Sequence, residues 1–384
     1  MSAKMSKQSP LLVFSDDWGR HPSSSQHLIR HLLPRREIVW INTIGTRPPR
    51  LDTQTLRRMI EKLRHWSKRS DSHDMGSEVL KPRIINPRMW PSFASSFGRR
   101  LNRHLLLKAL TPIVNSLDEP PIVVTTLPIV ADLVGSLRAK GWIYYCVDDF
   151  GVWPGYDGKT MQRMESILVP RMDRIIAVSE ELVEHVHSLG RSAELLTHGV
   201  DIDRWKVQSK ELPDELIGLE PPFIVFWGVI DRRMDTSFVA HLADRLEIGT
   251  IVMFGPQDNP DPALLRLPKV VVRSSVAFER LPYIAAAAGV LIMPYADLPV
   301  TRAIQPLKLK EYLASGRPSV VRALPSTLPW RDACDVCGTP ESFAEAVINR
   351  ISTNVPPEQK LAREKLAAEG WVEKAAIFNH LLES

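Results

Sequence analysis

Cysteine is scarce in this sequence, with three residues, at positions 146, 334 and 337, among 384. Three cysteines cannot form the disulfide framework of a small secreted protein, so a reducing, cytoplasmic location is expected. Long apolar runs are also missing, since no stretch approaches the roughly 20 apolar residues of a membrane-spanning helix. The first apolar run, Leu11–Phe14, is too short for the core of a signal peptide. We therefore expect a soluble or peripheral protein.

Several catalytic signatures are absent or incomplete. The sequence has no Gly-x-Gly-x-x-Gly motif, which removes the main support for a dehydrogenase, and no Gly-x-Ser-x-Gly elbow of a hydrolase. Residues Gly158–Thr160 end like a phosphate-binding P-loop, but Trp153 stands where the first glycine is required. Neither of these nucleotide-binding motifs therefore indicates the function of the protein.

Metal-ligand spacings are weak as well. Cys334 and Cys337 form a lone Cys-x-x-Cys without a second pair. His27 and His31 lie four residues apart without the glutamate of the metalloprotease pattern, which favours a helix surface or a cleft. Asp201–Asp203 imitates a metal-binding Asp-x-Asp motif, but its position after a glycine favours helix capping. We expect neither a metal nor a cofactor.

The charge is unevenly distributed. Hydrophobic residues make up 44% and charged residues 24%, which is typical of a globular protein, and the length suits two domains. Residues 1–120 hold 21 Lys plus Arg against 10 Asp plus Glu, whereas the remainder holds 28 against 34. The net charges of +11 and −6 sum to the overall +5 and suggest that the two regions meet different partners.

Apolar, β-branched runs alternate with helical patterns along the whole chain, which predicts an α/β fold with parallel sheets covered on both faces. Residues 204–221 are polar and contain proline, so they are expected to link an N-terminal domain, 1–203, to a C-terminal domain, 222–365. The helical tail 366–384 is expected to pack back on the first domain. The predicted strands are Leu11–Phe14, Glu37–Asn42, Ile122–Thr125, Trp142–Val147, Arg174–Val178, Ala193–Leu196, Pro222–Trp227, Gly249–Phe254, Val270–Arg273, Val290–Met293 and Ser319–Ala323.

The densest signal lies in the second half. A strand near 290–293 is followed by a loop and by a helix that begins near Pro306, carries Lys308 and Glu311, and ends at Gly316. The N-terminus of a helix after a parallel strand can bind an anion, and a nearby lysine adds a full charge. A carboxylate one turn farther suits the hydroxyls of a ribose. The alternative is an ordinary βαβ unit with solvated charges.

A companion segment lies upstream, where the strand 223–227 is followed by Gly228 and the basic pair Arg232 and Arg233. A glycine and a basic pair that enter a helix offer a second place for phosphate at the same edge of the sheet. The alternative is that both arginines face solvent.

Together these blocks resemble the retaining glycosyltransferases of the family-4 type (glycosyl transferases group 1). The segments that carry the resemblance are 172–203, 228–235, 254–256 and 306–321, and their order and spacing match over roughly residues 140–325. The segment 16–28 resembles a subgroup that acts on bacterial cell-envelope or capsular polysaccharides. The resemblance implies the GT-B fold, two Rossmann-like domains with parallel sheets facing each other across a cleft. It also implies transfer of a sugar from a nucleotide sugar to a glycan or lipid-linked acceptor.

The resemblance also implies residue roles. Cations would neutralise the donor diphosphate, Glu311 would hold the ribose, and backbone N–H groups near Ile304 would assist. The implied donor-binding residues are Gly228, Arg232, Arg233, Ser274, Ile304, Gln305, Lys308 and Glu311. The implied acceptor-side residues are Gly19, His198 and Gly199. The implied catalytic residues are Asp148, Asp149 and Lys308.

Two positions depart from the family pattern. Ala303 stands where the first of two glutamates is expected, so the usual donor-sugar contact is missing or supplied otherwise. The first loop has Trp18 before Gly19 where many members have paired glycines. A catalytically silent GT-B binding protein therefore stays open, and so does a GT-B nucleotide-sugar epimerase.

The expected chemistry is a retaining, metal-independent transfer in which a diphosphate oxygen helps to deprotonate the acceptor. Asp148 or Asp149 would serve as a base or bind the acceptor, or the pair would cap the turn before Gly151. Two basic helical segments, 56–69 and 97–110, would either lie on an anionic membrane surface or pack on the first sheet. Aromatic residues are not interleaved with the basic ones, so nucleic acid is not an expected partner.

Overall fold

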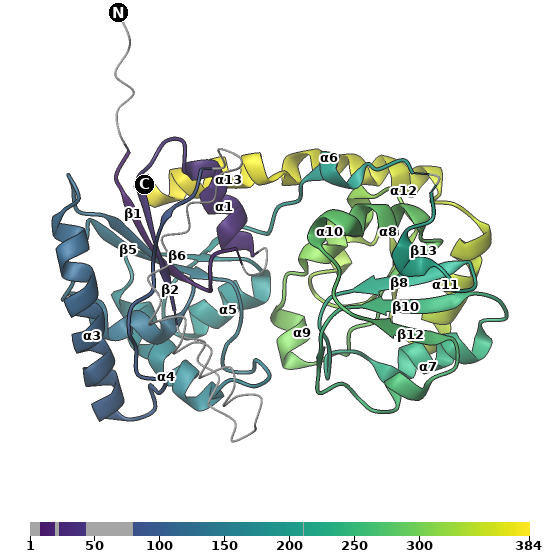
Figure 1. Cartoon of the computed structure of the whole chain (residues 1–384), viewed down its shortest axis with the longest axis horizontal. Coiled ribbons are helices and arrows are strands. Elements are labelled where there is room, and N and C mark those ends of the chain that lie inside the picture. The colour runs from purple at the N-terminus through teal and green to yellow at the C-terminus, as the bar shows by residue number, and fades with distance from the viewer. Residues whose placement is uncertain (1–7, 20–22, 44–79, 210) are drawn as a thin grey trace, which may run out of the picture. The chain divides into compact units, whose positions relative to one another are not determined.

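The computed structural model describes residues 8–19, 23–43, 80–209 and 211–384 (Figure 1). The chain divides into two compact units, each of which is considered by itself. The first unit comprises residues 1–177, 185–194 and 379–384, and the second comprises 178–184 and 195–378.

The first unit is built on a seven-stranded sheet with the strand order β3-β2-β1-β4-β5-β6-β7. Every registered strand pair from β1 to β6 is parallel. The strands are β1 (Leu11–Ser15), β2 (Ile38–Asn42), β3 (Arg83–Ile85), β4 (Ile122–Thr125), β5 (Gly141–Cys146), β6 (Arg174–Ala177) and β7 (Glu194–Leu195). The helices along this part of the chain are α1 (Ser24–Leu32), α3 (Ser96–Asn115), η1 (Pro128–Leu133), α4 (Gly158–Leu168), η2 (Val169–Arg171) and α5 (Glu180–Ser188).

The second unit repeats the same topology with a six-stranded sheet in the order β12-β10-β8-β13-β14-β15, and all of its registered pairs are parallel. Its strands are β8 (Phe223–Trp227), β10 (Thr250–Phe254), β12 (Val270–Arg273), β13 (Val290–Met293), β14 (Ser319–Arg322) and β15 (Asp335–Cys337), with β9 (Ile230–Asp231) and β11 (Gln257–Asp258) forming a separate small pair. Its helices are α6 (Ile202–Trp205), η3 (Asp214–Leu216), α7 (Thr236–Arg245), η4 (Leu264–Arg266), η5 (Phe278–Arg280), α8 (Leu281–Ala287), α9 (Pro299–Ala303), α10 (Leu307–Ala314), η6 (Leu328–Trp330), α11 (Pro340–Ser352), α12 (Pro357–Ala362), η7 (Arg363–Glu369) and α13 (Trp371–Glu383).

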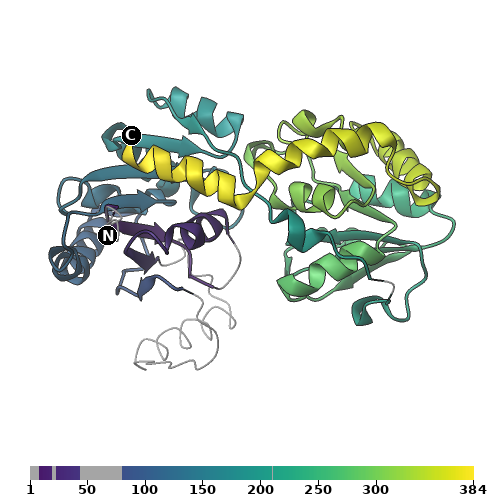
Figure 2. The same ribbon diagram turned by 90° about the horizontal axis from the view of Figure 1, so that it is seen from above.

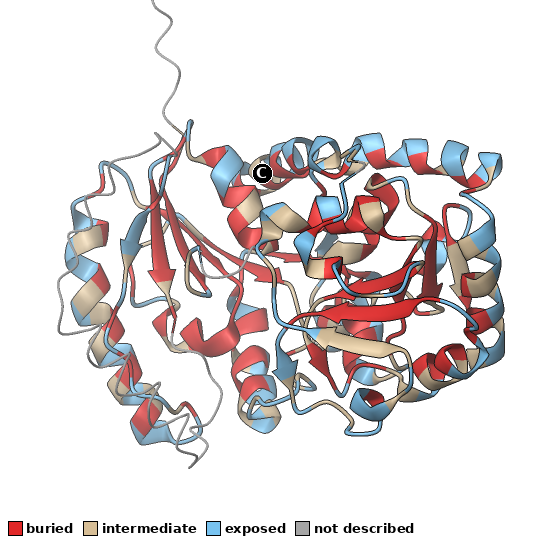
Figure 3. Ribbon diagram, turned by 45° about the vertical axis from the view of Figure 1, so that its right-hand side comes forward, coloured by how far each residue is buried: buried red, intermediate tan, exposed pale blue. Residues whose placement is uncertain are grey.

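The predicted α/β class with parallel sheets is confirmed, and each of the eleven predicted strands is present within one or two residues. Strands such as β1 and β8 are buried along their whole length, because helices cover both faces of the sheets (Figure 3). Four further strands of the described part of the chain were not predicted: the two-residue strands β9 and β11, which pair with each other, and β3 and β15. Strands β3 and β15 belong to the two main sheets. They lie at the edges of the sheets and are short and only partly buried, so they lack the continuous apolar run.

The boundary between the units lies earlier than the sequence predicted. Residues from Leu195 onward belong to the second unit, not to the first. Trp205, which is 1% exposed, and Leu216 lie in the core of the second unit, although residues 204–221 have the composition of a linker. Two apolar anchors among polar residues are enough to hold this segment against the domain.

The C-terminal helix α13 contributes residues to both units. Only its last residues, 379–384, belong to the first unit, where the yellow end of α13 lies beside the first sheet (Figure 2). Arg36 donates a hydrogen bond to Asn379 and forms an ion pair with Glu383.

Of the two basic helical segments, the structure describes only the second. Residues 56–69 lie outside the described residues, whereas 97–110 belong to α3. The buried face of α3 carries Leu106, Leu110 and Val114, and Arg99 forms an ion pair with Asp132, so this helix packs in the first unit. Among the described residues, no helix combines the length and apolar character needed to cross a membrane.

Candidate nucleotide-sugar site

The candidate site lies where the second sheet changes winding direction. Strands β8 and β13 are neighbours, and the chain proceeds outward from them in opposite directions, which gives the Rossmann strand order. Ligands of such sheets bind outside the carboxyl ends of the strands at this switch point. Gly228 directly follows β8 and Tyr295 lies two residues beyond β13, so both are at this edge.

Lys308 occupies the switch point from the first turn of α10. Its ammonium donates a hydrogen bond to the hydroxyl of Tyr295. It also lies 4.9 Å from the centre of the Tyr295 ring and 5.1 Å from that of Phe226, and these two rings meet edge to face. Cation–π contacts with two buried rings hold the ammonium in one place. The structure thus presents a fixed positive charge at the predicted phosphate position.

Two glycines bring bare backbone to this charge. Gly228 has a φ of 136°, and a Cβ there would lie 2.5 Å from the Lys308 ammonium nitrogen. Gly255, after β10, is packed against the same loop, because a Cβ on it would lie 1.8 Å from the carbonyl oxygen of Gly228. Gly228 itself donates its backbone N–H to Phe254. A larger residue at either position would push the loop away from the lysine.

Glu311 lies one turn along α10 from Lys308. Its Oε2 atom accepts a hydrogen bond of 3.1 Å from the indole Nε1 of Trp227, the last residue of β8. Burial raises the pKa of Glu311 to about 7, against the lowering effects of the Trp227 bond and of the positive charges of Lys308 and Arg204. The carboxyl therefore changes its charge in the neutral range.

The two arginines of the basic pair separate. Arg233 is buried and forms an ion pair with Asp231 at 2.8 Å, and its guanidinium lies 6.0 Å from the Tyr295 ring. Arg232 is exposed and donates to the backbone carbonyl of Asn259. The structure therefore brings Arg233 toward the ring that holds Lys308, with part of its charge balanced by Asp231.

The remaining donor-side predictions are less closely grouped. The backbone N–H of Ile304 donates to Val300 at the end of α9, so the expected free donor for phosphate is already engaged. Gln305 is buried, while Ser274 is exposed just beyond β12. Ala303, at the position of the expected glutamate, is buried, and its carbonyl accepts a hydrogen bond from Ser179.

His198 and Gly199 are held by structural contacts of the second unit. Lys310, fully buried on α10, donates to the carbonyl of His198. A Cβ at Gly199 would lie 2.7 Å from the ring of Trp371, so the glycine allows this loop to pack against α13. These contacts give the loop a packing role, and its predicted acceptor role stays a prediction.

The first unit carries the other predicted residues. Gly19, with a φ of 80°, donates its N–H to the side chain of Gln26 on α1. Asp148 and Asp149 follow β5, and Asp149 accepts a hydrogen bond of 2.9 Å from the N–H of Gly151. That bond is the turn cap that the sequence allowed as an alternative.

Sequence reasoning missed a polar group at the switch point of the first sheet, between β1 and β4. Ser15 ends β1, and its hydroxyl lies 3.0 Å from that of Thr126 and 2.9 Å from a carboxylate oxygen of Asp16. Burial raises the pKa of Asp16, against the lowering effect of hydroxyl donors that include Ser23. A Ser-Asp-Asp sequence directly after a buried strand was the available signal.

The cysteine pair and the Asp-x-Asp segment have structural roles. Burial raises the pKa of the Cys334 thiol to about 12 and that of Cys337 to about 11, so both stay protonated in the core at neutral pH. Asp201 caps α6 as predicted, accepting from the N–H of Arg204. The described residues contain no cluster of three His, Cys, Asp or Glu suited to a metal ion.

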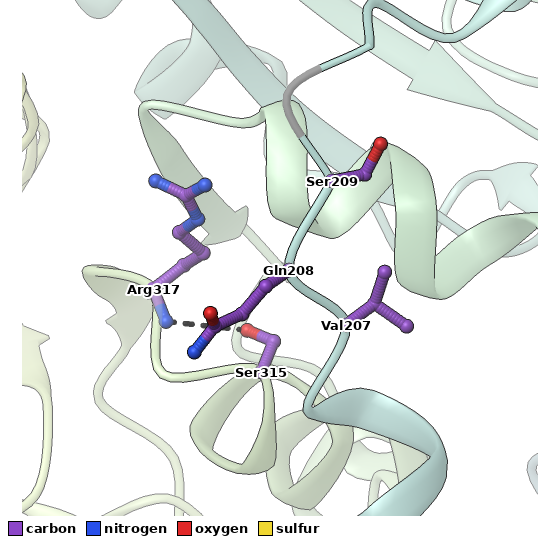
Figure 4. Close-up of a pocket in the computed structure, with 5 residues that line it drawn as sticks. All are labelled: Val207, Gln208, Ser209, Ser315 and Arg317. Atoms are coloured by element: carbon purple, nitrogen blue, oxygen red, sulfur yellow. Dashed lines mark hydrogen bonds between the residues drawn. The ribbon is translucent and has the colours of Figure 1, made fainter.

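A pocket of about 400 Å³ lies at the other end of α10 from Lys308 (Figure 4). Its walls come from the end of α10 and from the chain after α6, and none of the predicted site residues contributes to it. The lining residues are Val207, Gln208, Ser209, Ser315 and Arg317.

Comparison with known proteins supports the fold. No model of a protein family matches the chain. One relative, named "Putative teichuronic acid biosynthesis glycosyltransferase TuaH", from Bacillus subtilis (strain 168), is 31% identical over 179 residues. This match covers 44% of the chain and 45% of the relative, which is less than half the length of either.

Two solved structures match over nearly the whole length. Sucrose-phosphate synthase from Thermosynechococcus elongatus has a TM-score of 0.69 at 14% identity and covers 98% of both chains. HepE of Anabaena, in complex with UDP-glucose, has a TM-score of 0.69 at 11% identity and covers 98% of this chain and 100% of its own. Together with the two Rossmann-ordered parallel sheets, these likenesses establish the GT-B fold.

Proposed function

We propose that this protein is a glycosyltransferase of the retaining family-4 type that takes its sugar from a nucleotide-sugar donor. The observation that supports this most directly is the pairing of Lys308 and Glu311 on α10, at the switch point of the second sheet. The partial match to a glycosyltransferase of teichuronic acid biosynthesis points to an acceptor among bacterial cell-envelope polysaccharides or their lipid-linked precursors. HepE, whose structure contains UDP-glucose, makes UDP-sugars the first donors to test.

In this proposal, the Lys308 ammonium stabilises the negative charge that develops on the leaving diphosphate. An ammonium already fixed by Tyr295 and Phe226 needs no reorganisation as the bond to the sugar breaks. Gly228 lets the backbone approach the same phosphates, and Arg233 supplies a second cation beside the Tyr295 ring. Side chains would thus meet the diphosphate charge without a metal ion.

The acceptor hydroxyl would attack the anomeric carbon on the face from which the nucleoside diphosphate leaves, so the sugar keeps its configuration. The bond from the anomeric carbon to the diphosphate would break as the bond to the acceptor oxygen forms, and a diphosphate oxygen would take the hydroxyl proton. Asp148 and Asp149 are proposed to bind the acceptor or to act as bases, although Asp149 also accepts from Gly151. Gly19 and the His198–Gly199 loop are proposed to shape the acceptor side. Asp16, beside the first switch point, joins them as a carboxylate to test.

The experiment that tests this proposal compares purified wild type with Lys308→Ala. A thermal-shift screen against UDP, GDP, ADP and their sugars identifies the nucleotide, and turnover is then measured with the accepted nucleotide sugar. Loss of one transition-state cation should lower the rate about a hundredfold or more. Lys360→Ala, which removes an exposed lysine on α12, is the matched control. Unchanged turnover in Lys308→Ala would contradict the phosphate assignment.

A second candidate is a silent GT-B protein that binds a nucleotide or a glycan. Ala303 favours it, because a buried alanine stands where a donor-sugar carboxylate is expected. Hydrolysis of the nucleotide sugar distinguishes the two, since a transferase slowly hydrolyses its donor while a pure binder only shows a raised melting temperature. Turnover in the transfer assay or in the hydrolysis assay contradicts the hypothesis of a silent binding protein.

A membrane surface is the remaining proposed partner. On α3, Arg100, His104 and Lys108 are exposed at a spacing of four residues and form one basic face. Co-sedimentation with acidic vesicles, compared with neutral ones, tests whether this face binds an anionic surface. Equal binding to both lipids contradicts the proposal.

A further inference from the structure

The indole of Trp227 connects the core of the second unit to the candidate ribose position. Trp227 ends β8 and is 5% exposed, so its ring belongs to the core. Its Nε1 atom donates to Oε2 of Glu311. Within the described residues Oε1 of Glu311 accepts no hydrogen bond. The carboxylate is thus anchored by one oxygen and has the other available.

Two aromatic rings pack against the indole of Trp227, and a third packs against one of these two. Trp205 stacks on it with a centroid distance of 5.4 Å and an interplanar angle of 4°. Tyr312 meets it edge to face at 4.5 Å, from the helix that carries Glu311. Phe278 meets Trp205 edge to face at 6.0 Å. A ring held on two sides in a close-packed core offers its N–H in a single direction.

The charges around Glu311 make this bond consequential. Lys308 on α10 and Arg204 on α6 exert lowering effects on the pKa of Glu311, while burial raises it to about 7. Tyr312 adds a phenol whose own pKa is raised well above its usual value by burial. An indole N–H can only donate a hydrogen bond, so it stabilises the ionised form of the carboxylate. An ionised carboxylate only accepts hydrogen bonds and can take them from two neighbouring hydroxyls.

We propose that Trp227 is a positioning residue, which holds Oε2 of Glu311 so that Oε1 accepts from the ribose hydroxyls of the donor nucleotide. The inference rests on the proposed function and adds a determinant outside α10. It assigns the discrimination between a ribose and a deoxyribose nucleotide to the Trp227–Glu311 pair together, because a carboxylate free to rotate would lose this geometry.

The test removes the indole N–H while keeping an aromatic ring. Trp227→Phe and wild type are compared by calorimetry with UDP and 2′,3′-dideoxy-UDP between pH 6 and pH 8.5, or with the corresponding pair of whichever nucleotide the screen selects. We expect the preference for the ribose form to fall about tenfold in the variant. We also expect the pH midpoint of that preference to rise, because the carboxylate loses a bond that favours its ionised form.

A matched control uses the partner in the same stack. Trp205→Phe keeps an aromatic ring beside Trp227 and leaves the hydrogen bond from Trp227 to Glu311 in place, so its loss of ribose preference and its shift of the pH midpoint should be clearly smaller than those of Trp227→Phe. Where Trp227→Phe does not fold, benzothienylalanine at position 227 keeps the shape of tryptophan and lacks the N–H.

The outcomes distinguish a failure of the positioning role of Trp227 from a failure of the proposed function. Wild type that binds none of the nucleotides contradicts the proposed function itself. Wild type that prefers the ribose form, with a Trp227 variant of equal preference and equal pH midpoint, overturns the positioning role alone. A loss of preference that Trp205→Phe shares to the same degree also overturns it, because general packing then explains the effect.

Discussion

The carboxylate of Glu383 lies 2.7 Å from the guanidinium of Arg36, whose side chain is fully buried. Asn379 and the backbone carbonyl of Ser9 also accept from this guanidinium. A buried cation that loses its anionic partner keeps its desolvation cost without the compensating attraction. Glu383 and Asn379 thus stabilise a buried positive charge of the first unit.

Glu383→Gln should therefore lower the free energy of unfolding by about 2 kcal/mol. The measurement is the urea midpoint followed by circular dichroism. Glu364→Gln replaces an exposed glutamate on η7 and should leave the midpoint unchanged. Equal midpoints for the two variants would show that the ion pair contributes nothing.

The cluster at Glu369 predicts an order of effects. Glu369 lies 2.9 Å from the ammonium of Lys374 and also bonds to that of Lys310, and both lysines are at most 8% exposed. Glu369→Gln leaves two buried ammonium groups together, whereas Lys310→Met leaves the Glu369–Lys374 pair intact. Thermal unfolding should show Glu369→Gln to be the more destabilising by about 1 kcal/mol or more. The reverse order would contradict this assignment of charges.

Glu311 predicts a dependence of stability on pH. Its pKa in the folded protein, about 7, lies above the usual 4.5, because burial penalises the ionised form; the protonated form therefore contributes more to stability than the ionised form. That contribution is present below pH 4.5 and is lost as the pH rises to 7. Glu311→Gln should match wild type near pH 4.5 and exceed its stability by about 2 kcal/mol above pH 7. Glu358→Gln, an exposed site on α12, should show no such trend.

The hydroxyl of Tyr295 predicts a selective effect on phosphate binding. Tyr295→Phe keeps the ring beneath Lys308 and removes the hydroxyl to which its ammonium donates. Affinity for the nucleoside diphosphate should fall about fivefold to tenfold, and affinity for the free nucleoside should not change. Tyr283→Phe, at a residue 42% exposed on α8, is the control. An equal loss for diphosphate and nucleoside would argue against a phosphate role.

The sequence predicted the strands well because each is a continuous apolar run between helices, the pattern of a buried parallel sheet. It also predicted Lys308, Glu311 and Gly228 at the same edge of the sheet, because the loops that follow parallel strands all lie at one edge. It could not predict that Arg233 turns inward while Arg232 faces solvent, since adjacent residues have similar chemistry and only packing separates them.

The roles of Trp205 and Trp227 were beyond sequence reasoning for a related reason. Trp205 lies in a polar segment with the composition of a linker, and its stacking partner is distant in the chain. A contact of this kind depends on tertiary packing and leaves no local periodicity. The same holds for Ser15 and Thr126, which meet only because β1 and β4 are adjacent in the sheet.

The composition of the first unit has a consequence for synthesis. Its fragments come from residues 1–177, 185–194 and 379–384, so its last segment is translated after the whole second unit. Domains generally fold as the chain emerges from the ribosome, N-terminal parts first. Arg36 must therefore wait, without its carboxylate partner, until residue 383 has left the exit tunnel. Until then the first unit lacks this ion pair. During that time it is less stable than it is with the pair formed, and it depends more on protection from aggregation.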